Sequence, residues 1–252
     1  MSKIEVKNIK TLSFKNMSVT EEHHFTTNPN ENSLIVKLEF GKRTLYDMMN
    51  NWVSNREFLY GTSRFKNRIS RGQLYWHDNL NFFSSIWSNK DHARWQSQPH
   101  SLFIKSLQVH FNNIQRSYVQ EWNRNNIKHR LDEKHFNSTQ INKYIGPNDS
   151  IGAHADDQPD FGENPTIMIW SVGVPRKLRF LRLLYNPLKP RSKKIDTSFE
   201  PLDINMTPNS VLIMAGTTQK NFLHEIEKDP SIRETDVRHS VTFREHNPVS
   251  IL

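Results

Sequence analysis

The second half of the chain predicts a mostly β fold, a jelly roll or sandwich with flanking helices. Five candidate strands follow one another after Phe136, separated by turn residues. They lie at residues 139–145, 166–173, 178–184, 210–215 and 237–244. Dipeptides such as Gly-Pro and Asn-Pro stand between them and favour reversals of chain direction. Short strands at this spacing are typical of antiparallel sandwiches and jelly rolls.

The first half has a more mixed texture. Residues 1–33 are polar and predict an arm or an irregular edge strand, whereas residues 34–40 have the apolar content of a strand. Residues 43–52 carry Leu, Met and Trp at helical spacing. Residues 56–97 mix aromatic and basic side chains without a clean period, so we expect irregular structure there.

A long amphipathic helix is predicted between Pro99 and about Trp122. Apolar residues recur there every three or four positions, which is the spacing of one face of a helix. They are Leu102, Ile104, Leu107, Phe111, Ile114 and Tyr118.

The composition bounds the class of protein. A chain of 252 residues with 35% hydrophobic content can form one large domain or two small ones. The net charge of +8 favours a polyanionic partner such as nucleic acid, although a generic basic protein fits this charge equally well. The absence of cysteine excludes disulfides and thiolate metal sites, which leaves His, Asp and Glu as metal ligands.

The sequence also bears on the compartment. No apolar run is long enough to cross a membrane, and the polar N-terminus lacks the pattern of a signal peptide. We therefore expect an intracellular protein, nuclear or cytoplasmic, that has no membrane partner and acts as a monomer.

One tripeptide in the second half has the residues of a metal site. His154-Ala-Asp156 is the only His-x-Asp in the chain, and in a strand its two polar side chains would share one face. His224 would have to come from another strand to complete a set of two imidazoles and one carboxylate. This donor set holds ferrous iron and leaves coordination positions open. Taken alone, His154 would better fit a hydrogen-bonded core or surface histidine.

The last candidate strand, residues 237–244, adds a second signal. It alternates cleanly, so that Arg238, Ser240 and Arg244 share one face. The two arginine Cα atoms should lie roughly 20 Å apart, and guanidinium groups that lean inward could hold a five-carbon diacid. An isolated strand of this kind would more often leave its arginines in water. Together with the metal ligands, the pair suggests an oxygenase that uses iron and 2-oxoglutarate.

Read together, these motifs resemble the AlkB family of iron(II)- and 2-oxoglutarate-dependent dealkylases, and most closely its nucleic-acid repair branch. The resemblance covers about 110 residues, with motif order and spacing preserved. The matching segments are residues 136–144, 149–157, 159–165, 171–176, 217–224 and 238–244.

The resemblance implies a role for each matching residue. His154, Asp156 and His224 would bind Fe(II). Arg238 would pair with the distal carboxylate of 2-oxoglutarate, the cosubstrate consumed with O2. Arg244 would lie nearer the metal and steady either the cosubstrate or the ligand Asp156.

The resemblance also implies the architecture. Family members fold as a double-stranded β-helix, a jelly roll, with an N-terminal lid over the site. We therefore expect a polar arm at residues 1–33, the lid and supporting helices at residues 34–135 and the jelly-roll core at residues 136–252. Asn142 and Tyr144 match the Asn-x-Tyr element that hydrogen-bonds the cosubstrate.

Some positions depart from the family pattern or bear on the substrate. Gln158 stands where this branch usually has an acidic residue that recognises the damaged base, and Ser240 replaces an Asn of some members. An amide both donates and accepts hydrogen bonds, whereas a carboxylate only accepts, so the base preference is open. Tyr75 is a candidate for stacking on a flipped base, and Arg71 for the nucleic-acid backbone path. The sequence fits equally well if Tyr75 belongs to the core of the lid and Arg71 lies on a solvated surface.

The function implied by the resemblance is oxidative demethylation of N-alkylated bases in DNA or RNA, with release of formaldehyde. Extrusion of a damaged base into a pocket would be favoured because its pairing is already lost. Two alternatives stay open at this point. One is an oxygenase of the same chemistry that acts on protein side chains or a small molecule. The other is an inactive relative that only binds nucleic acid.

Overall fold

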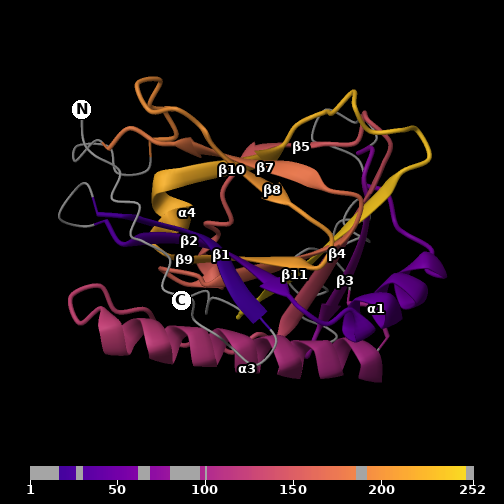
Figure 1. Cartoon of the computed structure of the whole chain (residues 1–252), viewed down its shortest axis with the longest axis horizontal. Helices are drawn as coiled ribbons and strands as arrows, with labels where there is room; N and C mark the ends of the chain where they lie inside the picture. Colours follow the sequence, from indigo (N-terminus) through magenta and orange to yellow (C-terminus); the bar gives the residue numbers. More distant parts are fainter. Residues whose placement is uncertain are drawn as a thin grey trace.

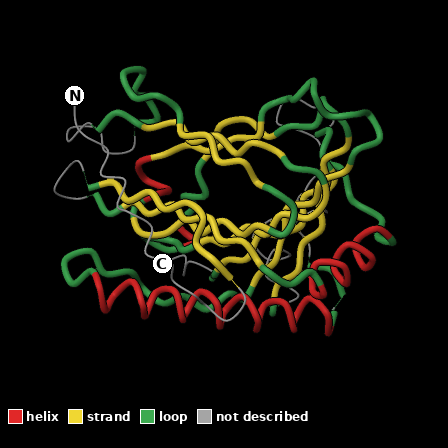
Figure 2. The backbone as a smooth tube through the Cα atoms, viewed as in Figure 1, coloured by secondary structure: helices red, strands yellow, loops and turns green. Residues whose placement is uncertain are grey.

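The structure is a computed structural model that describes residues 17–26, 31–61, 69–79, 97–99, 101–185 and 192–247. Two antiparallel sheets lie face to face, and helices cover the outer side of the larger one (Figure 1). Strands dominate the second half of the chain, with long connecting loops at both ends of the sandwich (Figure 2). The mostly β fold with flanking helices is the class expected from the sequence.

Seven strands form the large sheet. They are β1 (Met17–Phe25), β2 (Ser33–Phe40), β3 (Gly72–His77), β4 (Ser138–Ile145), β6 (Ile167–Gly173), β9 (Ser210–Gly216) and β11 (Val237–Arg244). Their order across the sheet is β1-β2-β9-β6-β11-β4-β3, and each neighbouring pair is antiparallel. Strand β11 therefore lies inside the sheet, hydrogen-bonded on both sides.

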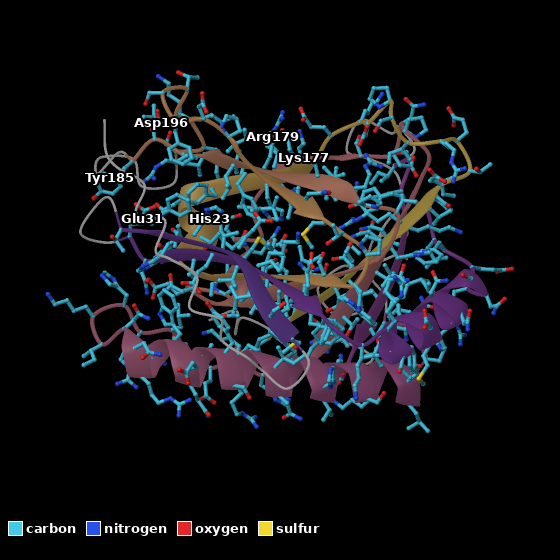
Figure 3. The ribbon with its side chains drawn as sticks, viewed as in Figure 1. His23, Glu31, Lys177, Arg179, Tyr185 and Asp196 are labelled. Atoms are coloured by element: carbon cyan, nitrogen blue, oxygen red, sulfur yellow. The ribbon has the colours of Figure 1, made fainter. Side chains whose placement is uncertain are left out.

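Four strands form the small sheet. They are β5 (Ile151–His154), β7 (Arg176–Arg182), β8 (Leu202–Met206) and β10 (Phe222–Ile226), in the order β5-β10-β7-β8. Leu178 and Phe180 of β7 are buried between the sheets. Lys177 and Arg179 alternate with them and pair with Asp203 at 3.1 and 2.8 Å on the outer face (Figure 3). This alternation is that of a sheet with one buried and one solvated face.

Helices α1 (Thr44–Ser54) and α3 (Leu102–Asn125) pack on the outer face of the large sheet (Figure 1). Helix α3 begins where the Ser101 hydroxyl accepts a hydrogen bond from the Ile104 N–H at 3.4 Å, a common N-terminal cap. Its apolar side is buried, and the Phe111 ring stacks on Phe243 of β11 with centroids 4.1 Å apart. The helix thus supports the strand that carries both arginines.

The central strands are buried on both faces. Met168 and Trp170 of β6 pack on the helix side, whereas Ile167 and Ile169 of the same strand pack between the sheets. Burial on both sides explains why β6 and β9 are nearly continuous apolar runs in the sequence. Within the described residues, no helix combines the length and apolar content that a membrane crossing needs.

One strand, β3, differs from the sequence-based expectation. Strand β3 lies inside residues 56–97, which predicted irregular structure because polar and aromatic side chains are mixed there. All six of its residues are buried, so neither face stands out by hydrophobicity. Strand β1, in contrast, has one of the two forms expected for residues 1–33, an irregular edge strand, with a register shift between Val19 and Glu21. Polar residues suit such an edge, which faces solvent on one side.

The expected division at residue 136 does not coincide with a boundary of the large sheet. Strands β1 and β2 and the β3 strand come from the segments expected to form the arm and the lid, yet they are hydrogen-bonded into that sheet. Strand pairing between distant segments leaves no local signal in the sequence. Residues 62–68 and 80–96, which carry much of the expected lid, lie outside the described part of the chain.

Replacing Phe111 by Ala should lower the free energy of unfolding by about 3–5 kcal/mol, because it opens a cavity against Phe243 and Trp170. Denaturant unfolding would measure the loss. Val109→Ala is the matched control on the same helix, since Val109 is 52% exposed. Equal stabilities for the two variants would contradict this packing.

Candidate metal centre and cosubstrate cavity

A cavity of about 310 Å³ lies between the two sheets. The large sheet contributes polar residues of β3, β4 and β11, and the small sheet contributes both histidines and apolar residues of β7 and β10. The residues discussed below that line it are Arg71, Gln73, Gln140, Asn142, Tyr144, His154, Asp156, Gln158, Phe161, His224, Arg238, Ser240 and Arg244.

Two histidines and one aspartate converge at the small-sheet side of this cavity. His154 of β5 lies directly opposite His224 of β10 in the antiparallel pairing, and their ring centroids are 4.3 Å apart. The His154 Nε2 atom is 4.0 Å from Asp156 Oδ1. One ligand atom from each of the three residues lies within 4.8 Å of the other two. This arrangement fits a single metal ion.

Asp156 does not lie in a strand, contrary to the alternation argument, because β5 ends at His154. Two contacts hold it instead. The Asp156 N–H donates to Gln219 Oε1 at 2.9 Å, and Arg244 Nη1 donates to Asp156 Oδ2 at 2.8 Å. The second contact occupies one carboxylate oxygen and leaves Oδ1 facing His154.

The charge states of these side chains suit metal binding. Burial raises the pKa of Asp156, but the positive charge of Arg244 and the two histidine rings outweigh it and leave the pKa lowered. Burial, with a contribution from His154, lowers the pKa of His224 to about 3. His154 Nδ1 donates to the Gly152 carbonyl at 2.8 Å, which leaves its Nε2 as the free acceptor. Neutral imidazoles and an ionised carboxylate are the forms that bind metal.

Arg238 forms the opposite, cationic end of the cavity. Its side chain is 1% exposed, and its Nε donates to Ser171 Oγ at 3.3 Å. Burial lowers its pKa to about 10, so the guanidinium stays charged at neutral pH. Its Nη1 atom has no hydrogen-bond partner among the described residues. A buried charge with unused donors is costly, so this end of the cavity fits an anionic ligand.

Arg244 has a different role from Arg238. Besides its contact with Asp156, its Nη2 donates to Gln140, and its guanidinium lies 4.6 Å over the Phe161 ring. Of the two roles that the resemblance left open, the geometry favours that of steadying the ligand Asp156. Neither arginine lies in water, because both faces of β11 are covered.

A polar row on β4 and β11 joins the two ends. Asn142 Nδ2 is 3.4 Å from Ser240 Oγ, and Gln73 Nε2 donates to Asn142 Oδ1 at 2.9 Å. The Tyr144 ring lies 5.5 Å from the Arg238 guanidinium. These side chains line the cavity beside the arginine, and the hydrogen bond to the cosubstrate that the Asn-x-Tyr match implied stays a prediction.

The substrate candidates separate into two groups. Gln158 and Arg71 line the cavity. Tyr75 is buried at 1% exposure and does not belong to the lining formed by the described residues. Its hydroxyl lies 2.9 Å from His246 Nδ1, in line with the alternative that Tyr75 is a core residue.

The similarity of the chain to known proteins agrees with this metal site and cavity. Residues 23–244 match a sequence model of the family described as the 2OG-Fe(II) oxygenase superfamily. The chain belongs to this family. The family description names 2-oxoglutarate and Fe(II). The three metal ligands fit the iron, and Arg238 Nη1, which has no hydrogen-bond partner among the described residues, fits the diacid.

Curated relatives of this chain carry AlkB names. A human relative, "Alpha-ketoglutarate-dependent dioxygenase alkB homolog 3", is 32% identical over 121 residues, which are 47% of this chain and 40% of the relative. An Arabidopsis thaliana relative, "DNA oxidative demethylase ALKBH2", is 28% identical over 125 residues, or 45% of this chain and 39% of the relative. The matches therefore span about two fifths of these relatives' length.

A solved structure supports the fold of the chain. "The structure of OsALKBH1" aligns with a TM-score of 0.57 at 11% identity, over 88% of this chain and all of that chain. At this identity the likeness concerns the fold alone. It agrees with the jelly roll expected from the sequence.

Several residues of the metal site and cavity were missed by the sequence analysis. Gln140 stands two positions before Asn142 in β4, so strand alternation could have placed it on the cavity face. Gln219 lies in the four-residue helix α4 (Thr218–Asn221), and Phe161 ends the 3₁₀ turn η2 (Pro159–Phe161). Nothing local in the sequence indicates that Gln219 reaches the backbone of Asp156.

Gln219→Ala should weaken metal binding by about 10–100-fold, because Asp156 loses the group that holds its backbone. Absorbance titration of the metal-free protein with Co(II) would measure the affinity. Lys220→Ala is the neighbouring control, since its side chain pairs only with the exposed Glu163 among the contacts of the described residues. Unchanged Co(II) affinity in Gln219→Ala would contradict this role.

Stability of the metal-free protein should fall with acid. Burial lowers the pKa of both His239 and His246 to about 3, below the ordinary value of 6.5. Because the unfolded state then binds more protons, stability is complete above about pH 6.5 and is lost as the pH falls toward 3, by up to about 1.4 kcal/mol per pH unit for each histidine.

Denaturant unfolding of the metal-free protein across this range would measure the slope. His239→Leu should reduce this slope by the contribution of one proton taken up on unfolding. The reason is that both His239 ring nitrogens are buried without a hydrogen-bond partner among the described residues. The exposed His135, changed to Asn, serves as the control. A slope that His239→Leu leaves intact would contradict the burial of a neutral imidazole there.

Proposed function

We propose that the chain is an Fe(II)- and 2-oxoglutarate-dependent oxidative demethylase of N-alkylated bases in DNA or RNA. The observation that carries the proposal is the pairing, in one cavity, of a three-ligand metal site with a buried guanidinium whose Nη1 has no hydrogen-bond partner among the described residues. A site that only bound nucleic acid would gain nothing from burying Arg238. The names of the curated relatives support the same chemistry and substrate.

Each residue of the site has its own proposed role. His154, Asp156 and His224 would hold Fe(II), which when bound supplies oxygen activation coupled to conversion of 2-oxoglutarate and O2 into succinate and CO2. Arg238 would hold the distal carboxylate of 2-oxoglutarate by charge-assisted hydrogen bonds. Arg244 keeps Asp156 ionised and oriented. One oxygen atom enters the N-methyl group, and the N–C bond of the resulting hydroxymethyl group then breaks to release formaldehyde. The hydroxyl proton passes to the ring nitrogen of a lactam base, or to solvent where the methylated base was cationic.

Basic charge supports a nucleic-acid substrate. The chain carries a net charge of +8, which favours association with phosphates. Arg71 is half-buried and lines the cavity, and its guanidinium can meet either a base or the nucleic-acid backbone. The monomeric state and the intracellular location stay predictions from the sequence.

Arg238→Ala should weaken 2-oxoglutarate binding by about 10–100-fold, because a charged hydrogen-bond pair is lost in a buried site. Calorimetry with Mn(II) in place of iron would measure the affinity without turnover. Arg179→Ala on the outer face of the small sheet is the control. An affinity unaffected by Arg238→Ala would remove Arg238 from the cosubstrate site.

Activity is tested with oligonucleotides, DNA and RNA, that carry single N-methylated bases. Formaldehyde release that needs Fe(II), 2-oxoglutarate and O2 is expected, and Asp156→Ala should abolish it. Turnover of 2-oxoglutarate with a protein or small-molecule substrate, but with none of the oligonucleotides, would favour the alternative oxygenase. Salt-dependent binding that Asp156→Ala leaves unchanged, with no turnover, would favour an inactive binding protein.

A further inference from the structure

The charged side chains around the cavity are strongly unbalanced. Three guanidinium groups line it, those of Arg71, Arg238 and Arg244. Among the described residues, Asp156 is the only carboxylate in the lining. Fe(II) and the two carboxylates of 2-oxoglutarate cancel each other in charge, so filling the site leaves this positive excess in place.

Both oxygens of the Asp156 carboxylate are already engaged within the site. Asp156 Oδ2 accepts from Arg244, and Oδ1 faces His154 in the metal site. Two other acidic residues nearby, Asp157 and Asp160, contact side chains outside the cavity lining. Asp157 pairs with Lys193, and Asp160 Oδ2 lies 3.8 Å from His246 Nε2. Neither belongs to the cavity lining formed by the described residues, so neither offers a negative charge to a base.

Two polar side chains of the lining, Arg71 and Gln158, are the candidates to meet a substrate base. Arg71 is half-buried, and its Nε has no partner among the described residues. Gln158 is exposed and contributes an amide that both donates and accepts. A bound base would therefore meet a cation and an amide, and would be stabilised by having carbonyl oxygens to accept from them.

Methylated bases fall into two electrostatic classes. A methyl group on N1 of adenine or N3 of cytosine leaves the ring with a positive charge. A methyl group on N3 of thymine or uracil, or on N1 of guanine, replaces an N–H and leaves a neutral lactam with a carbonyl beside the methylated nitrogen. Like charges brought together in a partly desolvated site repel strongly, whereas a lactam carbonyl accepts from a guanidinium.

We propose that this cavity selects neutral N-methylated lactam bases, of the 3-methylthymine, 3-methyluracil and 1-methylguanine type, over cationic methylated bases. The inference rests on the proposed function, since it assigns the substrate class of the same site. Selection comes from Arg71 and from the amide of Gln158, with the positive excess of the cavity acting against a cation.

The test is a competition among DNA oligonucleotides of one sequence that differ only in the methylated base. The bases are 3-methylthymine, 1-methylguanine, 1-methyladenine and 3-methylcytosine, and product analysis gives the ratio of kcat/KM values. The neutral pair should be favoured by at least about tenfold. Equal or faster demethylation of the cationic pair would overturn the inference while leaving the proposed function standing. Formaldehyde release from none of the four, and from none of the corresponding RNA oligonucleotides, would overturn both.

A charge variant tests the cause. Gln158→Glu places a carboxylate at the cavity and should shift the kcat/KM ratio toward the cationic bases by about tenfold, because it compensates their charge. Asn205→Asp adds the same charge on the exposed face of β8 and should leave the ratio unchanged. Arg71→Met should also narrow the preference, with thermal unfolding used to confirm that each variant is folded. A ratio insensitive to both cavity variants would show that these side chains do not set it.

Discussion

The ion pair between Arg244 and Asp156 joins the two sheets at the metal centre. Arg244 ends β11 of the large sheet, whereas Asp156 follows β5 of the small sheet. Their 2.8 Å contact offsets the cost of burying a carboxylate and orients the oxygen that the metal needs. Because Asp156 has no strand to hold it, its position depends on this arginine and on Gln219.

The same strand sets the length of the cavity. Arg238 and Arg244 share one face of β11, and the polar row from β4 lies between them. The opposite face of β11 carries Phe243, which is held by Phe111 of α3. Packing on the helix side therefore fixes the strand, and the strand fixes the separation between the metal end and the anion end. The packing of α3 against β11 therefore contributes both to the stability of the fold and to the position of the residues that would bind the cosubstrate.

Much of this arrangement could be predicted from local patterns. The alternation of residues 237–244 placed both arginines correctly on one face, and the spacing of apolar residues located α3 within a few positions. The convergence of His154 with His224 could not come from local pattern, because it depends on pairing between β5 and β10. There the likeness to a known family carried the argument.

Other features of the structure could not be predicted from the sequence, for physical reasons. Strand β3 is buried on both faces with mixed chemistry, so no alternation marked it. Tyr75 shares a strand face with the cavity residue Gln73, but its hydroxyl meets His246, more than 170 positions away along the chain. Gln219 acts through the backbone of Asp156. Each of these depends on a contact between distant segments, which a single sequence does not show.

The most direct test is a crystal structure with Mn(II) and 2-oxoglutarate bound under anaerobic conditions. The account predicts one anomalous scattering peak coordinated by the side chains of His154, Asp156 and His224, with the distal carboxylate of 2-oxoglutarate on Arg238. A metal ion bound elsewhere, or a cosubstrate carboxylate that does not contact Arg238, would contradict it.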